Sequence, residues 1–270
     1  MSAAGKGRTE EYLSEIGVAP LAPATSPFDP GYDPITVESH LAQSGHLMAS
    51  LKISMACWMI ADETATRAKT AAAADRGVAT VAGGGPFEIA VVQDRLTEYL
   101  DLCADVGFRR IECAEGFTSV PHPPAELVRM ARERGLEVEF ELGEKHSGAF
   151  TAQEVDRLLD CGREWLDAGA VRLIIEARES ALGVGLFGEG GNFDASLAER
   201  FVEAFGFEVV VFEAPNKSSQ FAILDYFGPE VRVANVRLEE LLRVEIYRRG
   251  LHSDAFGREN LRPRRPDAGT

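Results

Sequence analysis

Short apolar or β-branched runs recur along the chain, and each is followed by a loop and then by an amphipathic segment. Seven runs are typical of buried strands, at residues 51–55, 79–83, 110–114, 137–142, 171–177, 208–214 and 231–236. The segments between them repeat apolar residues at helical spacing, as Leu96, Tyr99 and Leu100 do, which is typical of a helix that buries one face. This alternation predicts parallel β–α units joined by right-handed crossovers.

A closed barrel and an open doubly wound sheet both satisfy this pattern. We favour an α/β fold with a single (β/α)8 TIM-type barrel of parallel strands, because glutamates recur near the carboxyl ends of several strands, where barrel active sites converge. In addition, no G-x-G-x-x-G follows the first strand. The eighth strand is the weakest in the pattern, and its best position is residues 25–29, ahead of a helical stretch at 35–47.

The flanking segments set the expected domain boundaries. Residues 1–23 are rich in Ala, Gly and Pro and mix charges without a period, which predicts a disordered N-terminal arm. The catalytic barrel is expected over 24–257, and a flexible tail over 258–270. A chain of 270 residues with 45% apolar composition is long enough for one barrel-sized core.

Charge and cysteine usage exclude several classes of protein. The formal net charge of −15 argues against nucleic acid or an anionic membrane as a partner. The four cysteines show no C-x-x-C spacing, which predicts a reduced protein without a zinc site. No apolar run approaches the roughly 18 residues of a membrane span, and the first 20 residues lack the apolar core of a signal peptide. We therefore expect a soluble cytoplasmic protein.

Carboxylates gather where the predicted strands end. The candidates are Glu112, Glu139, Glu141, Glu176, Glu179 and Glu213. Carboxylates converging on one barrel mouth would form a hard-oxygen site suited to Mg²⁺. Each glutamate alone could instead pair with a neighbouring Arg or Lys, but their repetition on successive strands favours a shared site.

Two lysines and two glycine-rich stretches extend this picture. Lys217 lies where a strand ends and a helix begins, so it could help to bind a phosphate, although the neighbouring Asn216 or Ser218 could simply cap the helix. Lys145 follows a strand end and could be a general acid, whereas most lysines in loops are solvated. Residues 83–88 and 183–191 are expected to be flexible active-site loops, with a surface hairpin as the alternative for the second.

Several longer motifs occur together in one order. They are IIEARES with GVGLF, VVFEAPNKSSQ, VRVANV and YRRGLHSDAFG. In this order and spacing they resemble the phosphosulfolactate synthase family over residues 25–257. The resemblance implies that residues 25–29 are the first of eight barrel strands. It also implies a carbon–sulfur lyase that adds sulfite to C3 of phosphoenolpyruvate with Mg²⁺ and gives 2-phospho-3-sulfolactate, on the way to coenzyme M.

The resemblance also implies residue roles. The implied catalytic residues are Lys145 as proton donor to C2, with Glu141 and Glu176. The implied Mg²⁺ ligands or their neighbours are Glu112, Glu141, Glu176 and Glu213. The implied substrate-binding residues are Lys52, Arg178, Lys217, Asn235 and Arg249. The expected partners are phosphoenolpyruvate and sulfite, and the sequence leaves homo-oligomerisation open.

Some positions depart from the family pattern. Residues 52–57 (KISMAC) keep only the lysine of the family's Lys-Phe-Gly-Trp-Gly-Thr, and Pro30 replaces a lysine. These changes bear on the nucleophile more than on the phosphoenolpyruvate half of the site. Two alternatives therefore stand beside sulfite addition. One is an enzyme that joins a different nucleophile to phosphoenolpyruvate or a related enol acid, and the other is a non-catalytic interaction protein similar to plant heat-stress proteins.

Overall fold

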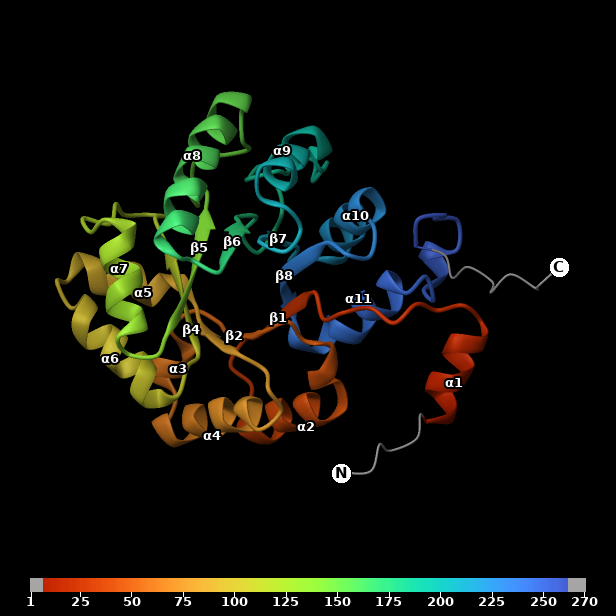
Figure 1. The fold of residues 1–270 in the computed structure, drawn as a ribbon, viewed down its shortest axis with the longest axis horizontal. Coiled ribbons are helices and arrows are strands. Elements are labelled where there is room, and N and C mark those ends of the chain that lie inside the picture. The colour runs from red at the N-terminus through yellow and green to blue at the C-terminus, as the bar shows by residue number, and fades with distance from the viewer. Residues whose placement is uncertain (1–6, 262–270) are drawn as a thin grey trace.

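Eight parallel strands close into a barrel in the computed structural model, which describes residues 7–261 (Figure 1). The strands are β1 Thr25–Asp29, β2 Leu51–Ile53, β3 Thr80–Ala82, β4 Arg110–Ala114, β5 Glu137–Leu142, β6 Arg172–Ile175, β7 Val210–Glu213 and β8 Arg232–Arg237. Each strand pairs with the next along the chain, and β8 pairs with β1. The predicted (β/α)8 barrel is confirmed, including its first strand at 25–29.

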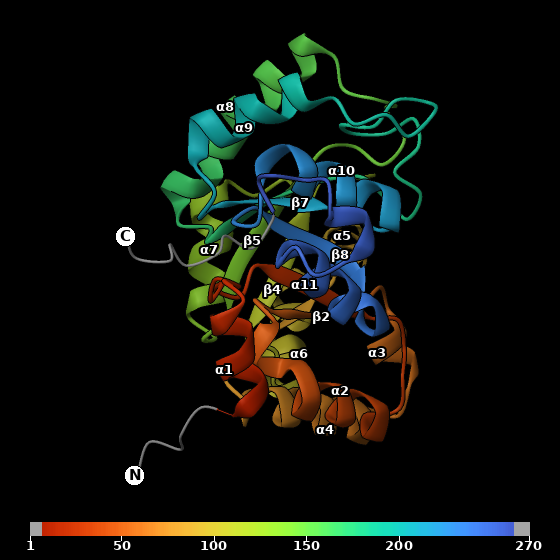
Figure 2. The ribbon, with the colours of Figure 1, turned by 90° about the vertical axis from the view of Figure 1, so that its right-hand side faces the viewer.

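Helices follow the strands and surround the barrel. They are α1 Arg8–Glu15, α2 Pro34–Ser44, α3 Cys57–Ile60, α4 Glu63–Ala74, α5 Gly84–Val92, α6 Leu96–Val106, α7 Pro124–Arg132, α8 Ala152–Ala168, α9 Ala195–Phe205, α10 Lys217–Phe227 and α11 Leu241–Arg248, with 3₁₀ turns at Gly45–Leu47, Leu238–Glu240 and Ser253–Ala255. In both ribbon views α2 and α4 lie side by side on one flank, and α8 and α9 lie on the opposite flank (Figure 2).

Capping side chains fix where these helices begin. Asp33 accepts hydrogen bonds from the second and third backbone N–H groups of α2, and Thr151 caps α8. Asn216 and Ser219 form a reciprocal capping box at the start of α10. Asn216 therefore caps α10, as the alternative to phosphate binding proposed, and Lys217 is the first residue of that helix.

Several predicted elements differ in extent. β6 ends at Ile175, two residues before the predicted end, because Ala177 and Arg178 turn away from the sheet and Arg178 adopts a left-handed φ of 55°. Residues 83–88 are not a flexible loop, since Gly83 precedes α5 and the following residues are its first turns. Residues 183–191 form a short hairpin-like loop with antiparallel bridges from Phe187 to Val184 and Phe193.

The terminal segments also differ from the expectation. The N-terminal arm that we expected to lack structure contains α1, which buries no side chain. At the other end, Leu261 is buried against the core, although it falls in the expected tail. The rest of that tail, residues 262–270, and residues 1–6 lie outside the described residues.

The largest apolar core lies between the barrel and its helices, where outward-facing strand residues meet the helix stripes. Inside the barrel the apolar cluster is small and consists of Ile174, Val211 and Ala234. The barrel interior is otherwise lined by charged and polar side chains. Because buried charges are costly unless paired, this polar interior indicates a function other than packing.

Candidate functional site

Lys145 lies between two carboxylates at the carboxyl-terminal end of the barrel. Its Nζ is 2.7 Å from Oε1 of Glu141 and 2.8 Å from Oε2 of Glu176. Glu141 is near the end of β5, and the chain then turns through Gly143, whose φ is 126°, so that Lys145 folds back over the strand end. Both carboxylates are buried, whereas the Lys145 side chain keeps 28% of its surface exposed. The ammonium is therefore the part of this triad that faces the solvent.

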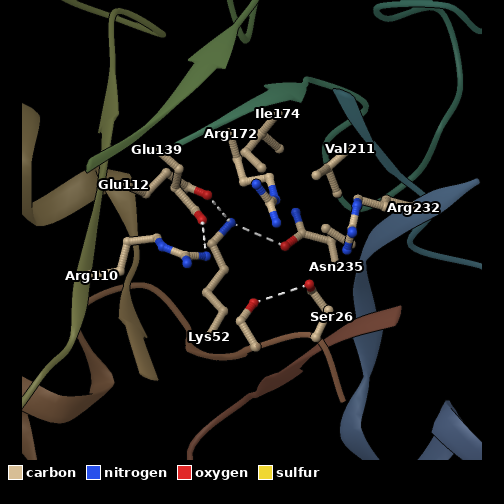
Figure 3. A pocket seen from close by; sticks show the side chains of 13 residues that line it. Ser26, Lys52, Arg110, Glu112, Glu139, Arg172, Ile174, Val211, Arg232 and Asn235 are labelled. Carbon is tan, nitrogen blue, oxygen red and sulfur yellow. Dashed lines mark hydrogen bonds and ion pairs between the residues drawn. The ribbon is translucent and has the colours of Figure 1, made fainter. Parts of the chain in front are cut away.

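Deeper in the barrel, Lys52 holds a second polar group together. Its Nζ is 2.7 Å from Oε2 of Glu112 and donates a hydrogen bond of 3.1 Å to Oδ1 of Asn235 (Figure 3). Glu213 lies beside this group, 3.8 Å from Lys52, and accepts a hydrogen bond from the Asn235 amide. The backbone N–H of Gly84, at the start of α5, also donates a 3.0 Å hydrogen bond to Glu112.

A β-bulge explains how Asn235 enters the barrel. In the pairing of β1 with β8, Ser26 faces Ala234 and Pro27 faces Val236, so Asn235 is the extra residue. Its φ of 55° lies in the left-handed region, which Asn tolerates better than most residues. The bulge thereby turns the amide toward Lys52 and Glu213.

The two groups are joined through backbone contacts at the end of β6. Oε2 of Glu213 accepts a 2.9 Å hydrogen bond from the N–H of Ala177, and Oε1 of Glu176 accepts one from the N–H of Arg178. Carboxylates from β4, β5 and β7 and from the residue after β6 thus belong to one connected network.

The carboxylates outnumber the cations that they contact, and their pKa values reflect this. Burial, reinforced by the charge of Glu176, raises the pKa of Glu141 and that of Glu213 well above the usual range. Burial also opposes ionisation of Glu176, but Lys145 and hydrogen bonds outweigh it and lower the pKa of Glu176 to about 2. The pKa of Lys145 is raised because its two carboxylates outweigh its burial, so Lys145 is an ammonium at neutral pH.

The comparisons with known proteins identify the family of the chain. The family model for (2R)-phospho-3-sulfolactate synthase (ComA) matches residues 23–254. The chain belongs to the phosphosulfolactate synthase family. The phosphosulfolactate synthase of Methanocaldococcus jannaschii is 30% identical over 231 residues, which are 85% of this chain and 92% of that protein. That of Methanothermobacter thermautotrophicus is 32% identical over 180 residues, 66% of this chain and 70% of that protein.

Solved structures with low sequence identity share the fold. The 3-hexulose-6-phosphate synthase of Salmonella typhimurium has a TM-score of 0.52 at 11% identity and covers 85% of this chain and 100% of its own. The carboxyl transferase domain of Rhizobium etli pyruvate carboxylase has a TM-score of 0.54 at 11% identity, covering 87% of this chain and 44% of that one. These similarities concern the barrel alone. Within residues 7–261, no helix is both long and apolar enough to span a membrane.

The substrate-binding residues expected from the phosphosulfolactate synthase family are not all in one place. Lys52 and Asn235 lie in the barrel network described above. Arg178 and Lys217 lie at the carboxyl-terminal rim and are exposed, and Lys217 forms a 2.7 Å ion pair with Asp254. Arg249 instead forms an ion pair with Glu245, whose other oxygen accepts a hydrogen bond from Thr25, the first residue of β1. Arg249 is thus at the amino-terminal end of the barrel, because α11 runs back down its wall.

Glu88 was missed as a single residue, although it ends the glycine-rich stretch 83–88. It is buried in α5, and its Oε2 accepts backbone hydrogen bonds of 2.8 Å and 3.0 Å from Phe117 and Thr118. Its Oε1 has no hydrogen-bond partner among residues 7–261. Burial raises the pKa of Glu88, and Lys145 opposes that rise. The only sign of it in the sequence is that a charged residue interrupts an otherwise apolar stretch, one helical turn after the start of α5.

The carboxylate network suits a hard divalent cation by its chemistry. Its donors are all oxygens, and burial together with the charge of Glu176 raises the pKa values of Glu141 and Glu213. No group of three or more metal-binding side chains within residues 7–261 is already arranged around a common point. Mg²⁺ keeps several waters and is commonly held by one or two carboxylates together with substrate oxygens, so one pair from this network is a sufficient protein contribution.

Proposed function

We propose that this enzyme adds sulfite to C3 of phosphoenolpyruvate and gives 2-phospho-3-sulfolactate. Lys145 carries the proposal, because its ammonium lies at the open end of the barrel between two buried carboxylates. A proton donor at this position, together with membership of the phosphosulfolactate synthase family, supports addition to an enol acid that ends with protonation of carbon.

The reaction balances with a single proton. The sulfur lone pair of sulfite forms the bond to C3, and the π electrons of the C2–C3 double bond move toward C2 and the carboxylate. Lys145 then donates its proton to C2, which leaves the phosphate ester intact. No oxidant or reductant is required. The lysine must regain a proton from the solvent, with which its partly exposed side chain is in contact.

The surrounding residues hold the proton donor and bind the substrate in this proposal. Glu141 and Glu176 keep Lys145 charged and fix the direction of its Nζ. Lys52 and the Asn235 amide offer donors from deeper in the barrel, and the rim residues Arg178 and Lys217 supply positive charge for the phosphate or carboxylate.

We further propose that Glu141 and Glu176, with Glu213 and Glu112 beside them, hold Mg²⁺. When bound, the ion would stabilise the negative charge that develops on the substrate carboxylate. The protein itself contributes buried negative charge. The neighbouring lysines neutralise only part of that charge.

An assay of phosphoenolpyruvate consumption tests the proposal. We expect consumption by the purified protein only when sulfite and Mg²⁺ are both present. Replacing the proton donor with Lys145→Ala should lower kcat about 10²- to 10⁴-fold, as is typical for loss of a general acid. His146→Ala is the matched control, because His146 is the next residue of the same loop and is exposed. If phosphoenolpyruvate persists under all these conditions, the proposed reaction is wrong.

The identity of the nucleophile is tested in the same assay. Thiols and phosphite are offered with phosphoenolpyruvate beside sulfite, since the family pattern is altered at residues 53–57, directly after Lys52. Consumption with sulfite alone supports the synthase reaction, whereas consumption with another nucleophile and not with sulfite replaces it. Binding of neither Mg²⁺ nor phosphoenolpyruvate, measured as an unchanged Tm, would favour the non-catalytic alternative.

A further inference from the structure

A polar cavity lies inside the barrel and extends from Lys52 toward the end opposite Lys145. It has a volume of about 40 Å³ and lies within the ring of strands. Three of its lining residues are Arg110, Arg172 and Arg232, which are the first residues of β4, β6 and β8. Because all the strands are parallel, their first residues lie together at the amino-terminal end. Alternate strands of a barrel contribute to one layer of side chains, so the three arginines form a layer.

The three arginines differ in how far neighbouring carboxylates neutralise their charge. Arg110 forms ion pairs with Glu139 at 3.0 Å and with Glu137 at 2.8 Å. Arg232 pairs at 2.7 Å with Glu208, whose side chain is 87% exposed. In the described part of the chain, Arg172 has no carboxylate within ion-pair distance, and its guanidinium donates only to the backbone oxygen of Val171 at 2.7 Å.

Arg172 is therefore the cation of this cavity that is left without a carboxylate partner among the described residues. The lining contains the three arginines and Lys52 with Glu112 and Glu139, and Glu137 and Glu208 pair with Arg110 and Arg232 from outside the lining. Burial and the neighbouring guanidinium groups of Arg232 and Arg110 lower the pKa of Arg172. A guanidinium that is half-buried beside two like charges is costly unless an anion offsets it.

The other lining groups are suited to oxygen atoms. Ser26 and Ser50 line the cavity, and the Ser50 hydroxyl donates a 3.0 Å hydrogen bond to that of Ser26. Figure 3 shows Arg172 and Arg232 pointing into the same space as Asn235. A volume of about 40 Å³ holds about three water molecules, which is the size of one small oxyanion.

We propose that this cavity is a binding site for one small inorganic oxyanion of the class of sulfate or phosphate, held by Arg172 and Arg232 at the amino-terminal end of the barrel. Planar guanidinium forks match the oxygens of such anions, and the serine hydroxyls add donors. The cavity shares Lys52, Glu112 and Asn235 with the deeper part of the candidate active site, but Lys145 and its two carboxylates do not line it.

Thermal unfolding with sodium sulfate as the probe tests the site. At constant ionic strength adjusted with sodium chloride, we expect Tm to rise through saturable binding at one site, with the logarithm of the sulfate concentration and by about 3 °C for each tenfold increase above Kd. Sulfate also stabilises proteins by exclusion from their surface. That contribution is proportional to concentration and is the same in all variants, so the titration is kept to the millimolar range, where it is small.

Substitutions test which residues are responsible for the rise in Tm with sulfate. Arg172→Gln should abolish the saturable rise, and in sulfate-free buffer it should unfold at the same or a higher temperature than the wild type, because one of three like charges is gone. Arg163→Gln is the control for loss of one arginine, since Arg163 is exposed on α8. Lys217→Gln controls for sulfate bound at the rim. Both controls should keep the rise.

The outcomes are distinct from those of the activity assay. A saturable rise that survives in Arg172→Gln, or one that is lost in Lys217→Gln, would overturn the proposal, as would its absence in the wild type. Should Arg172→Gln fail to fold, Arg232→Gln must show the same loss of the sulfate response for the site to stand. Inorganic phosphate in place of sulfate should act at the same residues, and a response to chloride alone would contradict an oxyanion site.

Discussion

Glu141 shows how a single buried carboxylate shapes this site. Burial raises its pKa and the charge of the neighbouring Glu176 adds to the rise, although Glu141 also contacts Lys145. A carboxyl group whose pKa is raised on folding binds its proton more tightly in the folded state. It therefore stabilises the fold below its unfolded pKa of about 4.3 and loses that contribution as the pH rises through its folded pKa.

Glu141→Gln should consequently stabilise the protein while reducing its activity. The amide keeps the shape and can still accept the hydrogen bond from Lys145, but it carries no charge. We expect the gain in unfolding free energy over the wild type to grow between pH 5 and pH 8 and to reach about 1 kcal/mol or more. Chemical denaturation of metal-free protein measures it.

The ionisation of Glu176 does not change between pH 5 and pH 8, so it does not affect the comparison of Glu141→Gln with the wild type. Its pKa is lowered to about 2, so its contribution is complete above about pH 4.3 and is lost only as the pH falls toward 2. Glu144→Gln, in the exposed part of the same loop, serves as control. A stability difference that shrinks with rising pH would contradict the proposed excess of negative charge.

Gly116 makes room for Lys145. A Cβ atom at Gly116 would lie 2.9 Å from both Cγ and Cε of Lys145, so Gly116→Ala should displace the flexible lysine rather than the backbone. We expect kcat to fall about tenfold or more with little change in Tm, because small misplacements of catalytic groups are costly. Gly85→Ala is the matched control, since nothing lies within 4 Å of its added carbon. Equal activity of both variants would show that Lys145 needs no fixed position.

At the scale of elements, the bulge in β8 is the local irregularity on which the deeper part of the site depends. Asn235 combines a left-handed backbone with two side-chain contacts, to Lys52 and Glu213. Asn235→Ala and Asn235→Gly remove the same contacts, but only alanine is strained at positive φ. We expect the alanine variant to be less stable than the glycine variant by about 1–2 kcal/mol. Equal midpoints in urea would mean that the bulge is not retained.

The pattern of apolar residues was sufficient for the elements but not for their ends. Seven strands follow from periodicity alone, whereas the strand at 25–29 contains Pro27 and only five residues, so the pattern gave it only as the best position and the family resemblance identified it as the first strand. Strand ends were overestimated where residues such as Ala177 continue an apolar run after the chain has left the sheet. Helix α5 was missed because three glycines mask a continuous apolar segment.

The sequence also located the carboxylates better than the cations. Glutamates at strand ends have their position set by the strand, so Glu112, Glu141 and Glu213 could be predicted to converge. Arg249 could not be placed, because its position depends on where α11 ends relative to the barrel. The arginine layer was overlooked, although an Arg begins three alternate strands, since the amino-terminal ends of barrel strands are usually associated with stability rather than with binding.

At the scale of the whole molecule, the barrel separates charge along its axis. Within residues 7–261, the interior carboxylates toward the carboxyl-terminal end outnumber the lysines beside them, while the opposite end has arginines in excess of their buried partners. If both proposals hold, a bound cation would stabilise one end of this interior and a bound anion the other. The two ends should therefore respond to different ions.

Magnesium removal tests the acidic end independently of activity. After treatment with EDTA, addition of MgCl₂ should raise Tm in a saturable manner, because two positive charges offset the repulsion among Glu141, Glu176 and Glu213. Sodium chloride at equal ionic strength should not, and the chloride salt is used so that sulfate does not reach the arginine layer. The rise should be lost in Glu176→Gln and retained in Arg172→Gln. An equal rise in Tm in both variants would show that Mg²⁺ acts elsewhere on the acidic surface.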